Sequence, residues 1–89
     1  MTVSREVQIA NRRGLHARAS AKFVTLATQQ PVAVQVAKGG STVTGTSIMG
    51  LMMLGAAMGD TITISAAGDE AEDVVAKMCE LVEAKFGEE

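Results

Sequence analysis

His16 is the first residue of this chain whose type and position suit chemistry. It follows a loop that contains Arg12 and Arg13, it precedes Arg18, and the apolar spacing of a helix begins just after it. Because the first N–H groups of a helix lack backbone partners, a helix that begins here would direct them at an anion near His16. A neutral imidazole is a nucleophile, and a guanidinium can hold a phosphate with paired donors. The arrangement suits a histidine that carries a phosphoryl group, with Arg18 stabilising that group.

Ser47 is the second candidate, at the start of a short segment rich in methionine. A serine at the start of a helix caps an unpaired N–H group, and that structural role alone would account for the residue. His16 has an equally plain alternative, in which the imidazole only caps a helix and Arg18 is a solvated surface charge. Residue type and spacing leave both alternatives open.

Composition excludes several other chemistries. The single cysteine, Cys79, cannot form an internal disulfide, and one histidine with one cysteine cannot supply the four ligands of a structural zinc site. No second acid–base residue accompanies His16, and no glycine-rich nucleotide loop is present, so a self-sufficient enzyme is disfavoured. RNA-binding sheets stack bases on aromatic side chains, whereas Phe23 and Phe86 lie at positions expected to be buried. We therefore expect no metal, cofactor or nucleic-acid partner, and keep an RNA-binding module as a distant alternative.

The net charge of −2 hides a strong asymmetry along the chain. Residues 1–59 carry six basic side chains against one acidic, and residues 60–89 carry nine acidic against two basic. The basic excess gathers around His16, since Arg12, Arg13, Arg18 and Lys22 are its neighbours in sequence. Such a distribution predicts a polarised domain that attracts a phosphate and acidic partner surfaces to the histidine.

Hydrophobic periodicity predicts the elements that must position these residues. Alternation at positions 3–9, 32–36, 42–44 and 61–66 predicts strands, with a glycine hairpin turn at 38–41. Helical spacing predicts a helix after His16 that ends before Pro31, and a short helix within 46–55 capped by Thr46 or Ser47. A last helix is expected after Asp69, with Asp69 and Glu72 capping each other and Gly87 ending it.

The order β-α-β-β-α-β-α predicts one α+β domain over residues 1–89, an antiparallel or mixed sheet with helices on one face. The N-terminus has no apolar signal core, so we expect a cytoplasmic protein. Residues 39–59 are 21 uncharged residues, but eleven are Gly, Ser or Thr, so we expect no membrane insertion. In the short helix, Ile48, Leu51 and the methionines 49, 52 and 53 cannot all face inward, so part of that segment is expected to be an exposed patch. The alternative places them all in the core.

Two segments resemble the motifs of the HPr family, the histidine-containing phosphocarrier proteins of bacterial phosphotransferase systems. GLHARAS at residues 14–20 is similar to the active-site segment, and SIMGLM at 47–52 is similar to the segment around the regulatory serine. Chain length, element order and the glycine hairpin also match, so the resemblance covers essentially the whole chain. It implies an open-faced β-sandwich, a four-stranded antiparallel sheet with three helices on one face.

The resemblance implies a role for each of these residues. His16 would accept a phosphoryl group on Nδ1 from Enzyme I, charged by phosphoenolpyruvate, and pass it to an enzyme IIA protein, with Arg18 stabilising the phosphate. Ser47 would be the target of an HPr kinase/phosphorylase, and the protein would be a monomer. A nitrogen-type regulatory relative, which signals by its phosphorylation state, is the alternative to a role in sugar uptake. The implied partner-binding residues are Arg12, Ala17, Ala19, Ser20, Ile48, Met49, Leu51 and Met52.

One position departs from the family pattern. The family usually has proline after the active-site arginine, and this chain has Ala19 there. Proline would preset the first helical turn and remove one N–H group, whereas alanine keeps a donor near the phosphate. We therefore expect a changed lifetime of the phosphohistidine, with the transfer reaction kept.

Overall fold

The computed structural model describes residues 1–88, which form one sheet and its covering helices. Its elements lie in the predicted order β-α-β-β-α-β-α. Within residues 1–88 the strands are β1 (Thr2–Gln8), β2 (Val34–Lys38), β3 (Ser41–Thr44) and β4 (Thr61–Ala67). The helices are α1 (Ala17–Thr28), α2 (Ile48–Met53) and α3 (Ala71–Glu83), followed by a 3-10 turn, η1 (Lys85–Gly87).

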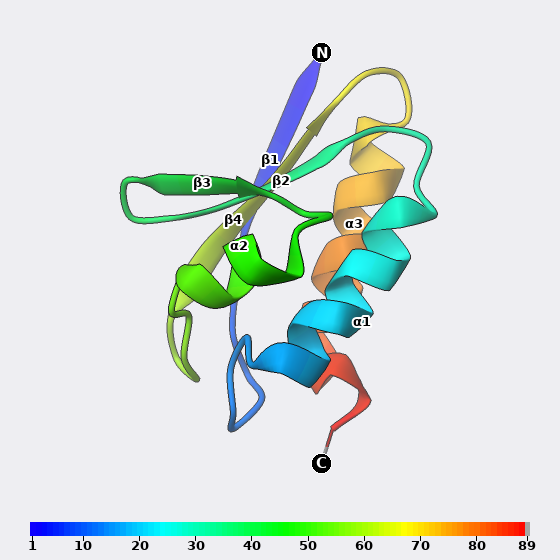
Figure 1. Ribbon diagram of the computed structural model, residues 1–89. Helices are drawn as coiled ribbons and strands as arrows, with labels where there is room; N and C mark the ends of the chain where they lie inside the picture. The colour runs from blue at the N-terminus through cyan, green and yellow to red at the C-terminus, as the bar shows by residue number, and fades with distance from the viewer. Residues whose placement is uncertain (89) are drawn as a thin grey trace.

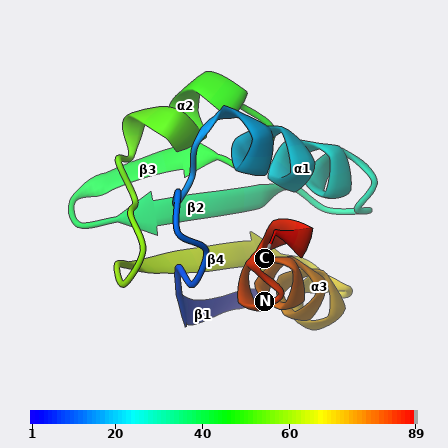
Figure 2. The ribbon, with the colours of Figure 1, turned by 90° about the horizontal axis from the view of Figure 1, so that it is seen from below.

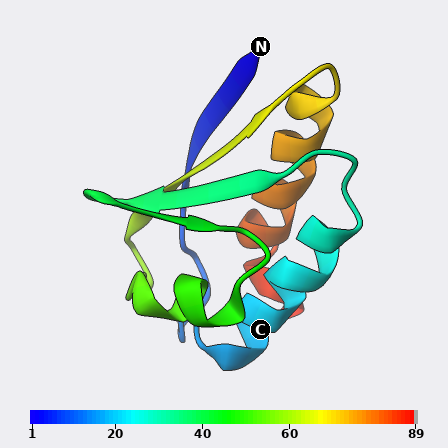
Figure 3. The ribbon, with the colours of Figure 1, turned by 45° about the horizontal axis from the view of Figure 1, so that its top comes forward.

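The sheet has the strand order β1-β4-β2-β3, and every neighbouring pair is antiparallel. Figures 1 and 2 show α1, α2 and α3 on the same face, with the other face left open. The predicted open-faced β-sandwich is thus confirmed. Figure 3 shows α2 and the start of α1 at one end of the sheet, where the chain also ends.

Alternating residues of the strands build the core beneath the helices. Ile62 and Ile64 of β4 and Val36 of β2 are fully buried, and their neighbours in sequence are not. Phe23 of α1 and Met78 of α3 are also fully buried. Fully burying a side chain of this size stabilises a fold by roughly 1.5–3 kcal/mol, so this layer holds the helices in place.

The first helix and the hairpin follow the sequence pattern closely. Helix α1 ends at Thr28, before Pro31, and the hairpin turns at Gly39, whose φ is +59°. Strand β2 begins at Val34, two residues later than predicted, because its pairing with β4 begins where Val34 meets Ala66.

The last helix differs from the prediction at both ends. Its N-cap is Glu70, which makes no capping hydrogen bond among residues 1–88, so the expected Asp69–Glu72 capping pair is wrong. The carbonyl of Gly68 accepts from the N–H of Ala71 at 3.3 Å, so a backbone turn begins this helix. Helix α3 also ends at Glu83, before Gly87, because the chain then enters η1.

In the part of the chain that is described, no helix has both the length and the apolar character needed to cross a membrane. The long uncharged run of residues 39–59 forms β3, the six-residue α2 and the turns around them.

The central position of Ile64 predicts a large effect of truncation. Ile64→Ala is expected to lower the free energy of unfolding by about 2–5 kcal/mol, because a cavity would remain between β4 and the helices. Thr61→Ala, at an exposed position of the same strand, should change it by less than about 0.5 kcal/mol. Urea unfolding followed by circular dichroism measures both, and equal losses would contradict this account of the core.

Candidate functional site

A close backbone approach shapes the loop that leads into α1. Gly14 has a φ of +64°, and a Cβ atom added there would lie 2.4 Å from the carbonyl oxygen of Ala56. The N–H of Leu15 donates to that same oxygen at 3.0 Å. A residue with a side chain would clash with this segment, so glycine at position 14 is required by the packing.

Two buried polar side chains hold the same loop from within. Asn11 Nδ2 donates to the carbonyl of Gly14 at 2.8 Å, and Ser20 Oγ donates to the carbonyl of Leu15 at 3.1 Å. Both side chains are almost completely buried. The expectation that Ser20 contacts a partner is therefore wrong, because its hydroxyl is used inside the protein.

His16 stands at the N-terminus of α1. It is the N-cap residue, with an extended backbone, but its side chain makes no capping hydrogen bond within the described part of the chain. The first bond of the helix joins the N–H of Ser20 to the carbonyl of His16 at 2.9 Å, so the N–H groups of residues 17–19 have no partner in the helix. The imidazole is thus available for chemistry beside a positive helix end.

Glu88 is the residue at this site that the sequence did not reveal. Its Oε2 lies 2.7 Å from His16 Nε2, and its Oε1 accepts from Asn11 Nδ2 at 3.1 Å. The hydrogen bond from His16, and a weaker contribution from Asn11, hold the pKa of Glu88 below its usual value. Glu88 also covers one edge of the imidazole, so only 19% of the His16 side chain is exposed.

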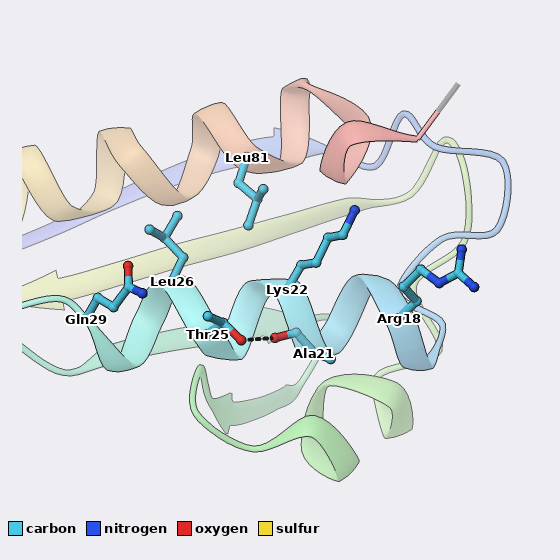
Figure 4. Close-up of a pocket in the computed structure, with 7 residues that line it drawn as sticks. All are labelled: Arg18, Ala21, Lys22, Thr25, Leu26, Gln29 and Leu81. Atoms are coloured by element: carbon cyan, nitrogen blue, oxygen red, sulfur yellow. Dashed lines mark hydrogen bonds between the residues drawn. The ribbon is translucent and has the colours of Figure 1, made fainter.

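The basic side chains around His16 form a shallow pocket of about 340 Å³, lined by Arg12, Arg13, His16, Arg18 and Glu88. All three arginines are exposed, which suits the binding of a phosphate from solvent. Lys22 does not line this pocket. Its Nζ donates to the carbonyl of Phe86 at 2.7 Å, and Figure 4 shows it pointing from α1 toward α3 and the chain end.

Beside this pocket a second groove of about 440 Å³ runs between α1 and α3, with Leu26 and Leu81 on its walls. Arg18 lines both hollows. Among residues 1–88, no three His, Cys, Asp or Glu side chains come together as metal ligands would. Cys79 is buried in the core and burial raises the pKa of its thiol, as suits a packing residue.

Ser47 occupies the position predicted for it, at the N-cap of α2. Its Oγ accepts from the N–H of Gly50 at 3.0 Å, so of the two predicted caps, Thr46 and Ser47, the serine serves. The side chain is partly exposed. It therefore has a structural role and can also be reached from outside.

Helix α2 presents an apolar surface beside the site. Met49 is 70% exposed and Met53 is 80% exposed, and Ile48, Met52 and Met58 are exposed as well, which confirms the predicted patch. Leu51 and Ala19 are completely buried. They support α2 and α1 from below, so the expectation that they contact partners directly is wrong, whereas Arg12 and Ala17 are exposed.

Comparison with known proteins gives consistent results. The family model "PTS HPr component phosphorylation site" matches residues 3–84. Phosphocarrier protein HPr of Neisseria meningitidis serogroup A is 42% identical over 86 residues, which cover 97% of each chain. Phosphocarrier protein NPr of Shewanella violacea is 38% identical over 86 residues, covering 97% of this chain and 94% of the relative.

Solved structures agree with the sequence relatives. The crystal structure of HPr-C-His from Thermoanaerobacter tengcongensis superposes with a TM-score of 0.91 at 39% identity and covers 98% of both chains. A crystal structure of an HPr dimer from the same organism has a TM-score of 0.75 at 40% identity, covering 92% of this chain and 94% of that one. The family model, the relatives and the fold lead to one conclusion: this chain belongs to the HPr family of phosphocarrier proteins.

Proposed function

We propose that His16 accepts a phosphoryl group on Nδ1 from phosphoenolpyruvate-charged Enzyme I and passes it to a histidine of an enzyme IIA protein. The observation that carries this proposal is the hydrogen bonding of the two ring nitrogens of His16 at the α1 N-terminus. Its Nε2 faces Glu88 at 2.7 Å, and no hydrogen bond to Nδ1 is found among residues 1–88. A neutral ring that donates from Nε2 has its lone pair on Nδ1, where a phosphorus atom can be attacked.

A carrier must stabilise the phosphoryl group without trapping it. The unpaired N–H groups of residues 17–19 and the guanidinium of Arg18 offer charge-assisted hydrogen bonds to phosphate oxygens. Of these residues Ala17 and Arg18 are exposed, and interactions with exposed charges are weakened by water and salt. Such partial stabilisation suits onward transfer, since the chain carries a phosphoryl group rather than catalysing a reaction of its own.

The exposed apolar patch on α2 is the proposed docking surface for these partners. Ile48, Met49 and Met52 lie on it, and we propose that the exposed Arg12 and Ala17, which are near His16 in the sequence, also contact the partner. Methionine is flexible and adapts to several partner surfaces in turn, while the arginines attract acidic ones. We propose that the chain acts as a single phosphocarrier domain over residues 1–89, as a monomer in the cytoplasm.

Ser47 is proposed as a regulatory phosphorylation site for an HPr kinase/phosphorylase. A phosphate there adds a charge of about −1.5 to −2 beside Ile48 and Met49, which carry no charge. That charge would oppose the docking of a partner surface that is acidic and apolar.

The second candidate function is regulation by phosphorylation state in a nitrogen-type system. The similarity to the Shewanella NPr favours it. This chain is 38% identical to that protein and 42% identical to the Neisseria HPr. Both functions use the same residues. Measurement of phosphoryl transfer to sugar-type and nitrogen-type enzyme IIA proteins would separate them.

Incubation with Enzyme I and phosphoenolpyruvate tests the main proposal. We expect one acid-labile phosphoryl group by mass spectrometry and none in His16→Ala. Arg18→Ala should slow its formation by about tenfold, less than the loss of a buried oxyanion donor, because Arg18 is exposed. Arg18→Lys keeps the charge but loses the paired donors, so its rate of phosphorylation should lie between the rates of Arg18→Ala and the wild type. A phosphoryl group that persists in His16→Ala would refute the assignment.

Substitution of Ser47 tests its two roles separately. Ser47→Asp keeps an acceptor for the Gly50 N–H and adds charge, so the domain should stay folded while phosphorylation of His16 slows. Ser47→Ala removes the cap and should lower the free energy of unfolding by about 1 kcal/mol without slowing phosphorylation. Equal phosphorylation rates for the Asp variant and the wild type would contradict regulation through charge.

Ala19 tests how the first helical turn sets the lifetime of the phosphohistidine. Its N–H is unpaired within α1, and Ala19→Pro removes that donor while fitting the first turn. One lost hydrogen bond should speed hydrolysis of the phosphorylated protein by about twofold to tenfold. Hydrolysis is followed at fixed pH by mass spectrometry, and identical rates would discard the idea.

A further inference from the structure

The chain end returns to the active site through an unusual turn. Lys85, Phe86 and Gly87 have φ values of +58°, +55° and +76°, three successive residues in the left-handed region. Lysine and phenylalanine rarely adopt it, because their Cβ atoms crowd the backbone there. Such strain persists only where surrounding contacts enforce it, and it concentrates at functional sites.

The packing of Phe86 and three hydrogen bonds enforce this turn. The Phe86 side chain is buried in the core, and its carbonyl accepts from Lys22 Nζ of α1 at 2.7 Å. Beyond the turn, the Glu88 carboxylate is gripped by Asn11 on one oxygen and by His16 on the other. Figures 1 and 3 show the chain end beside the first turn of α1. The strained turn thus places the Glu88 carboxylate at the Nε2 edge of the His16 imidazole.

This carboxylate decides which ring nitrogen of His16 carries the proton. An ionised carboxylate only accepts hydrogen bonds, so Nε2 must donate, and the lone pair of the neutral ring lies on Nδ1. The opposite tautomer would point the lone pair of Nε2 at Glu88 Oε2 across 2.7 Å, which is repulsive. Asn11 adds to this control because it holds the other oxygen of the same carboxylate and is itself buried.

We propose that Glu88 is a positioning residue for phosphoryl transfer, which holds His16 in the Nε2–H tautomer so that Nδ1 is the acceptor. This inference rests on the proposed function of His16. As Nδ1 gives its electron pair to phosphorus, a new N–P bond forms, and the bond between phosphorus and the donor group of Enzyme I breaks, with the electron pair of that bond returning to the donor group. The proton stays on Nε2, and the positive charge that the ring gains is paired with the Glu88 carboxylate. On onward transfer a nitrogen of the enzyme IIA histidine forms a bond to phosphorus, the bond to Nδ1 breaks, and its electron pair returns to Nδ1.

The tautomer can be tested without any phosphorylation. Nitrogen-15 NMR of the imidazole, at alkaline pH where the ring is neutral, reports which nitrogen is protonated. We expect wild-type protein to show Nε2–H alone, with an observable proton signal on Nε2. Glu88→Ala should show a measurable Nδ1–H population and lose that signal, whereas Glu88→Gln, whose amide oxygen can still accept, should retain most of it. An unchanged tautomer ratio in Glu88→Ala overturns the proposal.

Transfer kinetics with Enzyme I test the consequence. Glu88→Ala should reduce the rate of His16 phosphorylation by about tenfold, as is common when a carboxylate that orients a functional histidine is lost. Glu88→Gln should fall less, and Glu80→Gln, an exposed charge on α3, should match wild type. An equal fall in Glu80→Gln would point to long-range charge and overturn the proposal. If wild type itself accepts no phosphoryl group, the proposed function fails, and the NMR result still decides whether Glu88 sets the tautomer.

Discussion

The site depends on one backbone contact, between the loop before α1 and the segment after α2. Gly14 packs against the carbonyl oxygen of Ala56, and the N–H of Leu15 donates to that oxygen. The contact fixes where α1 begins, and so where His16 and the unpaired N–H groups lie. Figure 3 shows α2, which carries the methionine patch, at the same end of the sheet as the start of α1, which His16 caps. A single clash at position 14 would therefore disturb both the phosphate site and the docking surface.

The charges of the chain have a clearer meaning in three dimensions. The arginines at positions 12, 13 and 18 meet at the pocket around His16, as their closeness in sequence predicts. The acidic half of the chain is not kept apart from them, because Glu88 returns from the far end and contacts the imidazole. Lys22, which lies near His16 in sequence, instead binds the carbonyl of Phe86 and secures that return. The pocket around His16 is thus lined by three arginines that are close in sequence and by Glu88, which is distant in sequence.

Patterns of local spacing predicted most of the fold. The alternation that ends in Ile62 and Ile64 and the spacing that places Phe23 inside are periodic signals, and burial follows them. Ser47 as a cap is likewise a local relation, reaching only to Gly50. Asp69 failed as a cap because a backbone turn at Gly68 satisfied the N–H of Ala71 instead. Sequence motifs do not show such competition between side chain and backbone.

The residues that the sequence could not assign are those whose roles come from distant packing. Leu51 belongs to a motif that suggests a surface, yet a short helix over a sheet must turn some residue inward, and here it is Leu51. Glu88 lies 72 residues from His16 and follows a turn whose left-handed lysine and phenylalanine no propensity would predict. The motif therefore names the nucleophile, while the partner that orients it comes from the tertiary fold. For a carrier this division is physically reasonable, because the ring must be held firmly on its Nε2 side while its Nδ1 side gains and loses a phosphoryl group.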